Sequence, residues 1–408
     1  MSKANHTFEL VTVSGPDAPG ITSELTSVLA LGDIQIVDIG QSVIMGLLSL
    51  SILFELSEQS SQKLVIRDLN LKANALGLKL DSQIILPERL KHQEHLQKKD
   101  HHYVVTLLGD RISARALHKV ATHFANHKLN IDQIERLSEE AFSAVELRVS
   151  SAELQEKNVL KKDLLSIARE CGIDVALQTE GLFRRTKRLV AFDMDSTLIQ
   201  NEVIDELARQ KGVYDEVSRI TRDAMGGRMD FDESLRRRVE KVQGLALSDL
   251  EEVFKRIKLT PGAEELILVL KKLGYRTALI SGGFTFVAER LKAQLGIDYC
   301  HANTLEIADG KLTGKVIPPI INAQRKADAL AQICQTENIP LDQAVAVGDG
   351  ANDLLMLEKA GLGIAFNAKP LVSERADLSV SQKNLRTILY LLGISGRDLA
   401  HALRPAKT

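Results

Sequence analysis

The sequence predicts an α/β protein in which a parallel-sheet domain with a helical cap follows two tandem ferredoxin-like βαββαβ units. Three observations predict this class. Strand-like and helix-like segments occur twice in the order β-α-β-β-α-β before residue 180, short apolar runs then alternate with helical segments, and a charged insertion lacks strand-like runs. A length of 408 residues accommodates two to three domains of ordinary size.

The first unit is expected over residues 1–86. A turn signal, Gly15-Pro16-Asp17-Ala18-Pro19-Gly20, separates its first strand from its first helix. The β-branched and helix-period patterns predict strands over 8–13, 34–44, 47–56 and 78–85, and helices over 21–31 and 62–76.

The second unit is expected over residues 102–180, after a linker over 87–101. Its predicted strands are 103–108, 130–137, 142–149 and 173–178, and its predicted helices are 113–127 and 160–171. The charged stretch between the units contains His92, His95, His101 and His102. These histidines offer metal ligands in principle, but a metal site needs fixed geometry, so we interpret the stretch as a solvated linker.

The last domain is expected over residues 181–408. Short apolar runs over 189–192, 277–280, 344–347 and 363–366 are typical of strands buried on both faces of a parallel sheet. The insertion over about 200–260 is predicted to form a helical cap. Thr260-Pro261-Gly262 is interpreted as the start of the next helix, with Thr260 as N-cap. Asp309-Gly310 predicts a hairpin within 303–317.

The composition excludes several classes of protein. Basic and acidic side chains number 52 and 54, and there is no Trp, so we expect no nucleic-acid partner. The three cysteines, Cys171, Cys300 and Cys334, are far apart in sequence, which argues against disulfides and thiolate metal sites and favours a reducing compartment. The longest uncharged stretch, residues 39–54, is too short and polar to span a bilayer. We therefore expect a cytoplasmic protein without a membrane partner.

The strongest chemical signal is Asp193-Met194-Asp195-Ser196-Thr197, directly after the apolar run 189–192. Because side chains alternate along a strand, Asp193 and Asp195 leave its end on one face, at the edge of a parallel sheet where ligands usually bind. The alternative is that one aspartate caps a turn and the other lies on the surface.

Three further segments follow predicted strands or open helices. Ser281-Gly282-Gly283 places a hydroxyl and backbone amides before a helix, although such glycines also make simple turns. Lys326 lies near the start of the helix 323–335, where a lone lysine is usually solvated. Gly348-Asp349-Gly350-Ala351-Asn352-Asp353 is rich in hard oxygen ligands, which suit Mg²⁺ better than zinc.

These segments, in this order, resemble the haloacid dehalogenase (HAD) superfamily. The cap residues resemble those of its phosphoserine phosphatases, in the long form with two N-terminal ACT-type domains, and the resemblance covers essentially the whole chain. It implies Mg²⁺-dependent hydrolysis of O-phospho-L-serine to L-serine through an aspartyl-phosphate, the last step of L-serine biosynthesis. Two alternatives stay open: a phosphatase or phosphotransferase for another small phosphomonoester, and an amino-acid sensor with an inactive phosphatase domain.

The resemblance implies catalytic roles for three residues. Asp193 is the expected nucleophile, Asp195 the expected general acid and base, and Lys326 offsets the charge repulsion between carboxylate and phosphate. The expected Mg²⁺ ligands are the carboxylates of Asp193 and Asp349 and the backbone carbonyl of Asp195. Asp353 is expected to orient Lys326 or a water molecule on the metal.

The resemblance also implies the residues that bind substrate. Ser281, Gly282 and Lys326 are expected to hold phosphate oxygens, and Asn352 to contact the substrate. Glu202 is expected to meet the ammonium group and Arg238 the carboxylate, although Arg236-Arg237-Arg238 also resembles an exposed basic face. Met225 and Phe231 are expected to close the cap over the ligand.

The N-terminal repeats match ACT domains in part. Asp17-Ala18-Pro19-Gly20-Ile21 resembles the loop that opens the first ACT helix, whereas the second copy has Gly109-Asp110-Arg111-Ile112 without the Pro-Gly pair. We expect a homodimer built partly through residues before Glu180, regulated by L-serine. The alternative is that the repeats serve only assembly.

Overall fold

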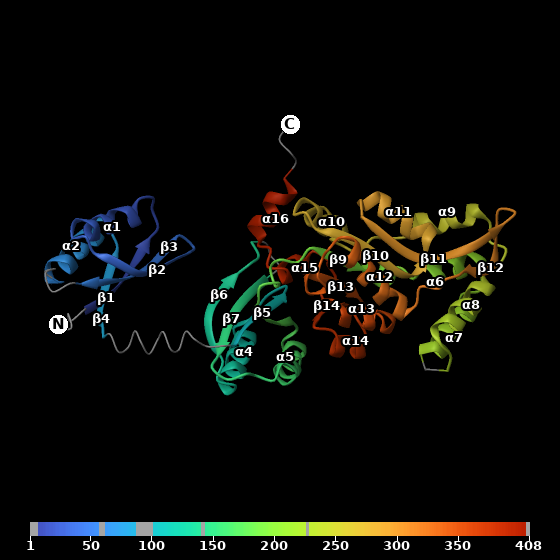
Figure 1. Ribbon diagram of the computed structural model, residues 1–408, viewed down its shortest axis with the longest axis horizontal. Coiled ribbons are helices and arrows are strands. Elements are labelled where there is room, and N and C mark those ends of the chain that lie inside the picture. Colours follow the sequence, from blue (N-terminus) through green and yellow to red (C-terminus); the bar gives the residue numbers. More distant parts are fainter. Residues whose placement is uncertain (1–6, 57–61, 87–100, 140–142, 226–227, 405–408) are drawn as a thin grey trace. The chain divides into compact units, whose positions relative to one another are not determined.

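The computed structural model describes residues 7–56, 62–86, 101–139, 143–225 and 228–404 (Figure 1). The chain divides into two compact units, Met1–Lys99 and Asp100–Thr408. Among the described residues, no helix combines the length and the apolar content needed to cross a membrane.

The N-terminal unit has the predicted βαββαβ order. Its core is formed by the alternating buried residues of β3 and by the apolar stripe of α1, where Ile21, Leu25 and Leu29 are buried. The sheet is antiparallel, in the order β2-β3-β1-β4. The elements are β1 (Thr7–Pro16), α1 (Ile21–Leu31), β2 (Gln35–Ile44), β3 (Leu47–Leu56), α2 (Gln62–Ala75) and β4 (Lys79–Ile85).

The second unit opens with another βαββαβ fold, whose sheet order is β6-β7-β5-β8. Its first strand begins at His101, so His101 and His102 belong to a strand rather than to the linker. Residues 87–100, with His92 and His95, and the predicted strand start at Phe142 lie outside the described residues. The elements are β5 (His101–Gly109), α4 (Ala114–Asn126), β6 (Asn130–Arg136), β7 (Ser143–Ser151), α5 (Lys157–Cys171) and β8 (Asp174–Thr179).

Strands β5, β7 and β8 of this second ferredoxin-like sheet are largely buried on both faces, whereas the edge strand β6 is exposed. Helices α4 and α5 pack against one face, and α15 (Thr387–Leu391) lies against the other. The side-chain amide of Gln178 donates a hydrogen bond to the Leu391 carbonyl (3.0 Å), and the Asp174 carboxylate accepts one from the backbone amide of Ser381 (2.9 Å). Burial on both faces explains why β5 is an almost continuous apolar run, whereas β1 alternates.

The C-terminal domain is built on a seven-stranded sheet in the order β12-β11-β10-β9-β13-β14-β15. Strand β9 lies at its centre, parallel to β10 and β13. All strands are parallel except β12, which forms the predicted hairpin with β11 around Asp309 and Gly310, both with positive φ. The strands are β9 (Leu189–Phe192), β10 (Arg276–Phe284), β11 (Tyr299–Ala308), β12 (Lys311–Ile317), β13 (Ala344–Gly348), β14 (Leu362–Phe366) and β15 (Leu378–Val380).

Helices cover both faces of this sheet. Val190 and Phe192 of β9 join one core cluster, and Leu189 and Ala191 join the other, so the strand is apolar at every position. The helices are α10 (Ala263–Lys272), α11 (Thr285–Leu295), α12 (Ala323–Thr336), α13 (Leu354–Lys359), α14 (Pro370–Arg375), α15, and α16 (Gly396–Leu403).

The charged insertion forms a helical cap, as predicted. Its helices are α6 (Val203–Lys211), α7 (Tyr214–Met225), α8 (Phe231–Lys241) and α9 (Leu247–Arg256). The prediction of Thr260 as an N-cap is wrong: α10 begins at Ala263, and the cap is Gly262 with φ +80°. A Cβ atom on Gly262 would lie 2.0 Å from Asn384 Oδ1, so the close approach of two loops requires glycine here.

Candidate active site

Asp193 lies at the carboxyl end of the central strand, where β9 meets β13. Its amide donates to the Val347 carbonyl of β13 (2.8 Å), and its Oδ1 accepts from the Met194 amide (2.7 Å). The chain then turns through η1 (Met194–Leu198), in which Ser196 has φ +57°. This tight turn keeps Asp195 at the same sheet edge as Asp193, as the sequence predicts.

Lys326 is fully buried and links two carboxylates. Its Nζ lies 2.8 Å from Asp193 Oδ1 and 2.6 Å from Asp353 Oδ1. Burial alone would lower the pKa of Lys326, but the two carboxylates outweigh it and raise that pKa above its ordinary value. The structure thus makes Lys326 a fixed cation at the sheet edge rather than the solvated helix residue of the alternative interpretation.

Three carboxylates gather around this edge. One oxygen atom from each of Asp193, Asp349 and Asp353 lies within 4.8 Å of the others. Asp349 Oδ1 also accepts from Thr197 Oγ1 (3.1 Å), and Asp353 Oδ2 accepts from the Gly350 amide (2.9 Å). Asp353 contacts Lys326 and also belongs to this cluster. The sequence had predicted only that Asp353 would orient Lys326 or a water molecule on the metal.

The carboxylate cluster fits a hard divalent cation. Burial, then the neighbouring carboxylates, raise the pKa of Asp193 to about 7 and that of Asp349 to about 8. One lysine therefore leaves buried negative charge uncompensated, and the donors are all oxygen atoms, as Mg²⁺ and Ca²⁺ prefer. The cluster shares Asp193 and Asp349 with the expected ligands, and it adds the carboxylate of Asp353.

Asp195 has an unsatisfied oxygen atom. Its Oδ1 is buried and lacks a hydrogen-bond partner among the described residues. Burial, followed by the charges of Glu202 and Asp193, raises its pKa well above the ordinary value. A protonated carboxyl group at this position is chemically able to donate a proton to a ligand.

The Ser281-Gly282-Gly283 segment ends β10 beside the aspartates. The buried Ser281 hydroxyl accepts from the Gly283 amide (2.8 Å), and the Gly282 carbonyl accepts from Asn303 Nδ2 (2.8 Å). A Cβ atom on Gly283 would lie 2.8 Å from Asp195 Oδ2, so glycine is required for the loop to approach the carboxylate. The segment therefore does more than turn the chain.

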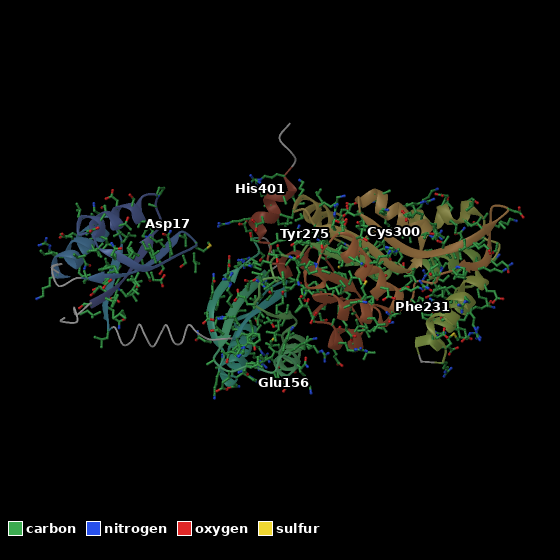
Figure 2. The ribbon with its side chains drawn as sticks, in the orientation of Figure 1. Asp17, Glu156, Phe231, Tyr275, Cys300 and His401 are labelled. Carbon is green, nitrogen blue, oxygen red and sulfur yellow. The ribbon has the colours of Figure 1, made fainter. Side chains whose placement is uncertain are left out.

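A cavity of about 700 Å³ joins this sheet edge to the cap. Among the predicted site residues whose side chains are described, its wall contains all except Lys326 and Asp353, which are fully buried. The predicted residues in the wall are Asp193, Asp195, Glu202, Phe231, Arg238, Ser281, Gly282, Asp349 and Asn352. The location of Phe231 on cap helix α8 is labelled in Figure 2.

Glu202 and Arg238 lie in the cap side of this wall. Ser196 Oγ donates to Glu202 Oε1 (2.7 Å), and desolvation raises the pKa of Glu202. In the basic run, Arg236 and Arg237 are exposed and form i,i+4 ion pairs with Asp232 and Glu233, whereas Arg238 is half-buried in the cavity wall. The interpretation of this run as an exposed basic face therefore holds for Arg236 and Arg237 but not for Arg238.

Met225 ends α7, but its side chain lies outside the described residues, and Met229 occupies the cavity wall on this side. Sequence reasoning also missed Thr197, Asp205, Asn303 and Lys369. Thr197 is part of the first aspartate motif, which was a usable signal. The other three lack a local pattern, because only the fold brings them to the cavity or to the loop that lines it.

Three family models match the chain. A haloacid dehalogenase-like hydrolase model matches residues 187–361, and two ACT-domain models match residues 7–83 and 101–178. A phosphoserine phosphatase of Streptomyces coelicolor is 42% identical over 395 residues, covering 96% of this chain and 94% of the relative.

Two further proteins are similar to about half of this chain or more. A phosphoserine phosphatase of Idiomarina loihiensis is 53% identical over 209 residues, 51% of this chain and 95% of the relative. The crystal structure of a HAD family hydrolase from Salmonella enterica has a TM-score of 0.63 and 30% identity, and the match covers 71% of this chain and 98% of that one.

Proposed function

Because the chain belongs to the phosphoserine phosphatase family of the haloacid dehalogenase-like hydrolases, we propose that it hydrolyses O-phospho-L-serine to L-serine and phosphate, through an aspartyl-phosphate on Asp193. The observation that carries this proposal is the single cavity that contains Asp193 at one end and Glu202 and Arg238 at the other. The proposal places the reaction at the last step of L-serine biosynthesis, in the cytoplasm, where the three free cysteines would remain reduced.

The first step transfers the phosphoryl group to the Asp193 carboxylate. Lys326, 2.8 Å from Asp193 Oδ1, reduces the repulsion between this carboxylate and the phosphate dianion, and Asp353 holds Lys326 in place. Mg²⁺, held by the carboxylates of Asp193 and Asp349 and the backbone carbonyl of Asp195, would neutralise further phosphate charge. The Ser281 hydroxyl and the Gly282 amide are proposed to hold phosphate oxygens.

Asp195 is proposed to move the proton in both steps. Its raised pKa keeps a proton available for the departing serine oxygen, which is a poor leaving group as an alkoxide. The resulting carboxylate then takes a proton from the water that attacks the phosphorus of the aspartyl-phosphate. Phosphate leaves, and both aspartates return to their starting states.

Substrate selection is proposed to depend on the cap. The Glu202 carboxylate would pair with the ammonium group of phosphoserine, which would favour the charged form of a residue whose pKa desolvation raises. Arg238 would bind the substrate carboxylate through its planar fork. Asn352 would contact the substrate, and Phe231 and Met225 would close the cap over it.

Replacing Glu202 by Gln or Arg238 by Ala is expected to lower kcat/KM for phosphoserine by about 100-fold or more, because positioning contacts are lost. The rate with 4-nitrophenyl phosphate, which has neither an ammonium group nor a carboxylate, should change only a few-fold. Arg237→Ala, on the exposed side of the same helix, is the matched control. Equal losses on both substrates would show that these residues are structural.

Release of inorganic phosphate from a panel of phosphomonoesters tests the proposed function directly. Phosphoserine should be the preferred substrate, EDTA should stop the reaction, and added Mg²⁺ should restore it. Preference for another phosphomonoester would overturn the assignment of phosphoserine as substrate. If no phosphate is released from any of them, an amino-acid sensor with an inactive phosphatase domain is favoured.

We also propose that L-serine binds the N-terminal ACT domain. A cavity of about 400 Å³ lies beside the loop that opens α1, with Gln41 and Leu48 in its wall. Gln41 Oε1 accepts from Thr22 Oγ1 (3.1 Å), so the cavity offers both polar side chains and backbone amides to a small amino acid.

Gln41→Ala is expected to weaken inhibition by L-serine several-fold without changing the uninhibited rate, because Gln41 lies in the wall of this cavity and not in that of the active-site cavity. Gln83→Ala, on an exposed position of β4, is the control. Since L-serine is also the product, some inhibition through the active site will remain in both variants. Identical inhibition curves for Gln41→Ala and the unmodified chain would contradict the regulatory role.

A homodimer completes the proposal. Strand β2 lies at an edge of its sheet, and its apolar side chains are well exposed, including Ile39 (47%), Val43 (44%) and Ile44 (72%). An exposed edge of this kind is typically covered by a partner. Val43→Lys should therefore convert a dimer into a monomer in analytical ultracentrifugation, and an unchanged mass would exclude β2 from the interface.

A further inference from the structure

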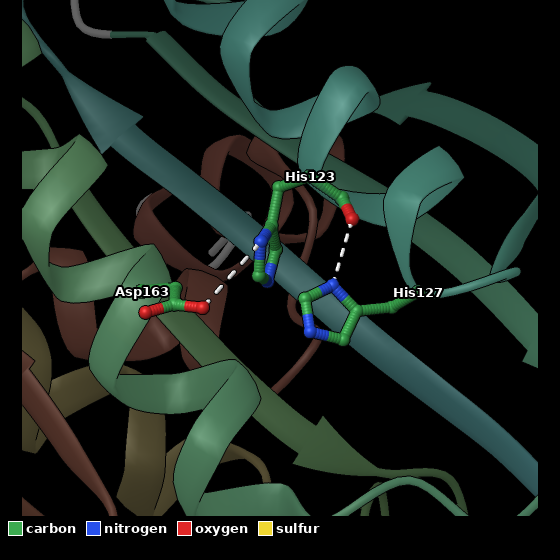
Figure 3. A group of neighbouring side chains, drawn as sticks. All are labelled: His123, His127 and Asp163. Carbon is green, nitrogen blue, oxygen red and sulfur yellow. Dashed lines mark hydrogen bonds and ion pairs between the residues drawn. The ribbon is translucent and has the colours of Figure 1, made fainter.

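A second group of possible metal ligands lies far from the catalytic residues, between helices α4 and α5 of the second ACT domain. His123 and His127 are one helical turn apart at the end of α4, and Asp163 projects from α5 (Figure 3). One ligand atom from each residue lies within 4.8 Å of the others. The His123 ring lies between Asp163 and His127 (Figure 3).

His123 has no hydrogen-bond partner that explains its burial. Its side chain is 8% exposed, and its Nε2 atom is buried without a partner among the described residues. Its Nδ1 lies 4.0 Å from Asp163 Oδ2, which is beyond hydrogen-bond distance. A buried imidazole nitrogen atom without a partner is costly unless another ligand is present.

His127 is oriented as metal-binding histidines usually are. Its Nδ1 lies 3.0 Å from the His123 carbonyl oxygen. A carbonyl only accepts, so Nδ1 carries the proton and the lone pair is on Nε2, the tautomer that binds a metal through Nε2. The ring centroids of the two histidines are 4.4 Å apart, so the two imidazoles are in contact.

We propose that His123, His127 and Asp163 bind a divalent transition ion of the zinc type and thereby link α4 to α5. Two imidazoles and one carboxylate form a ligand set that Zn²⁺ accepts, with water completing a tetrahedral site. Ligand atoms in such a site are about 3.3 Å apart, so small side-chain rotations suffice to close the present spacing.

The linkage would stabilise the helix that holds the second ACT domain against the phosphatase domain. Helix α5 carries Lys161, whose Nζ donates to the carbonyls of Glu374 and Ala376, at the end of α14 and just after it. The α4 end of the cluster has no such contact in the hydrogen bonds of the described residues. Ion pairs of Arg115 and Lys119 with Glu170 already link α4 to α5, and a bound ion would add a second link at the other end of α4.

Zinc binding by the full chain in excess Mg²⁺, measured by competition with a chromogenic chelator, tests this proposal without depending on phosphatase activity. The unmodified chain should bind one more Zn²⁺ equivalent than His127→Gln, and Zn²⁺ should raise its Tm by several degrees but leave that of the variant unchanged. His118→Gln, an exposed histidine on the same helix, should bind like the unmodified chain.

Asp163→Asn provides a second test, because it alters a side chain that is half exposed and is not expected to disturb folding. It should weaken Zn²⁺ binding at this site by about 10-fold or more. If the unmodified chain, His127→Gln and Asp163→Asn bind equal numbers of Zn²⁺ ions with equal affinity, the cluster is not a metal site and the proposal fails.

Discussion

Replacing Asp193 by asparagine is expected to lower kcat for phosphoserine by at least about 10⁴-fold, because the amide does not form an acyl phosphate. The change is nearly isosteric and removes a single buried carboxylate. Substrate binding should weaken far less than turnover falls, because Glu202 and Arg238 stay in place at the other end of the cavity. Stopped assays that measure released phosphate, together with binding measured by calorimetry, separate the two effects.

The control for this variant is Asp328→Asn, an equivalent change at an exposed position of α12. It should retain the full rate. Asp195→Asn should also lose activity, but through loss of the proton donor, so its effect should be smaller for a substrate with a good leaving group such as 4-nitrophenyl phosphate. A near-normal rate for Asp193→Asn would remove this residue from the chemistry.

Lys326→Met is expected to reduce both activity and stability. Lys326 is fully buried between Asp193 and Asp353, so its removal leaves two buried carboxylates without their cation. Loss of one partner from a buried ion pair typically costs about 3 to 5 kcal/mol of unfolding free energy. Urea denaturation in metal-free buffer measures this cost, and phosphate release measures the loss of turnover.

Two further variants show whether the effect of Lys326→Met on stability comes from the buried ion pair. Lys359→Met removes a partly exposed lysine 3.6 Å from Asp328, and its effect on unfolding free energy should stay below about 1 kcal/mol. The double variant Lys326→Met/Asp353→Asn removes one of the unpaired charges and should recover part of the lost stability. A Lys326→Met chain as stable as the unmodified protein would show that the ion pair contributes no net stability.

Most of the fold could be predicted from the sequence because most elements show either the helical period of 3.6 residues or the strand period of 2. Helix α1 begins and ends at the predicted residues, as does β3, since each has one clearly buried face. Helix α14 and strand β15, after residue 366, were not predicted, because with six and three residues they are too short for a period to repeat. The misplaced start of α10 has a tertiary cause, the close packing of Gly262 against Asn384.

The catalytic end of the site was more predictable than the cap. Asp193 and Asp349 each follow a buried strand, and Ser281 lies near the end of another, so sheet topology alone brings them together. Arg238 differs from Arg236 and Arg237 only in its direction from α8, which depends on how the cap helices pack. Met229 was missed for the same reason. The buried position of Lys326 likewise depends on the packing of α12 rather than on any local pattern.

The central claim is that Asp193 carries the phosphoryl group during hydrolysis of phosphoserine. Borohydride reduces an acyl phosphate to an alcohol, so quenching the reacting enzyme with borohydride should convert Asp193 to homoserine, which peptide mass spectrometry identifies. Conversion at Asp193 that requires both phosphoserine and Mg²⁺ is the predicted result. Steady phosphate release with an unmodified Asp193, or with conversion at another aspartate, would contradict the account.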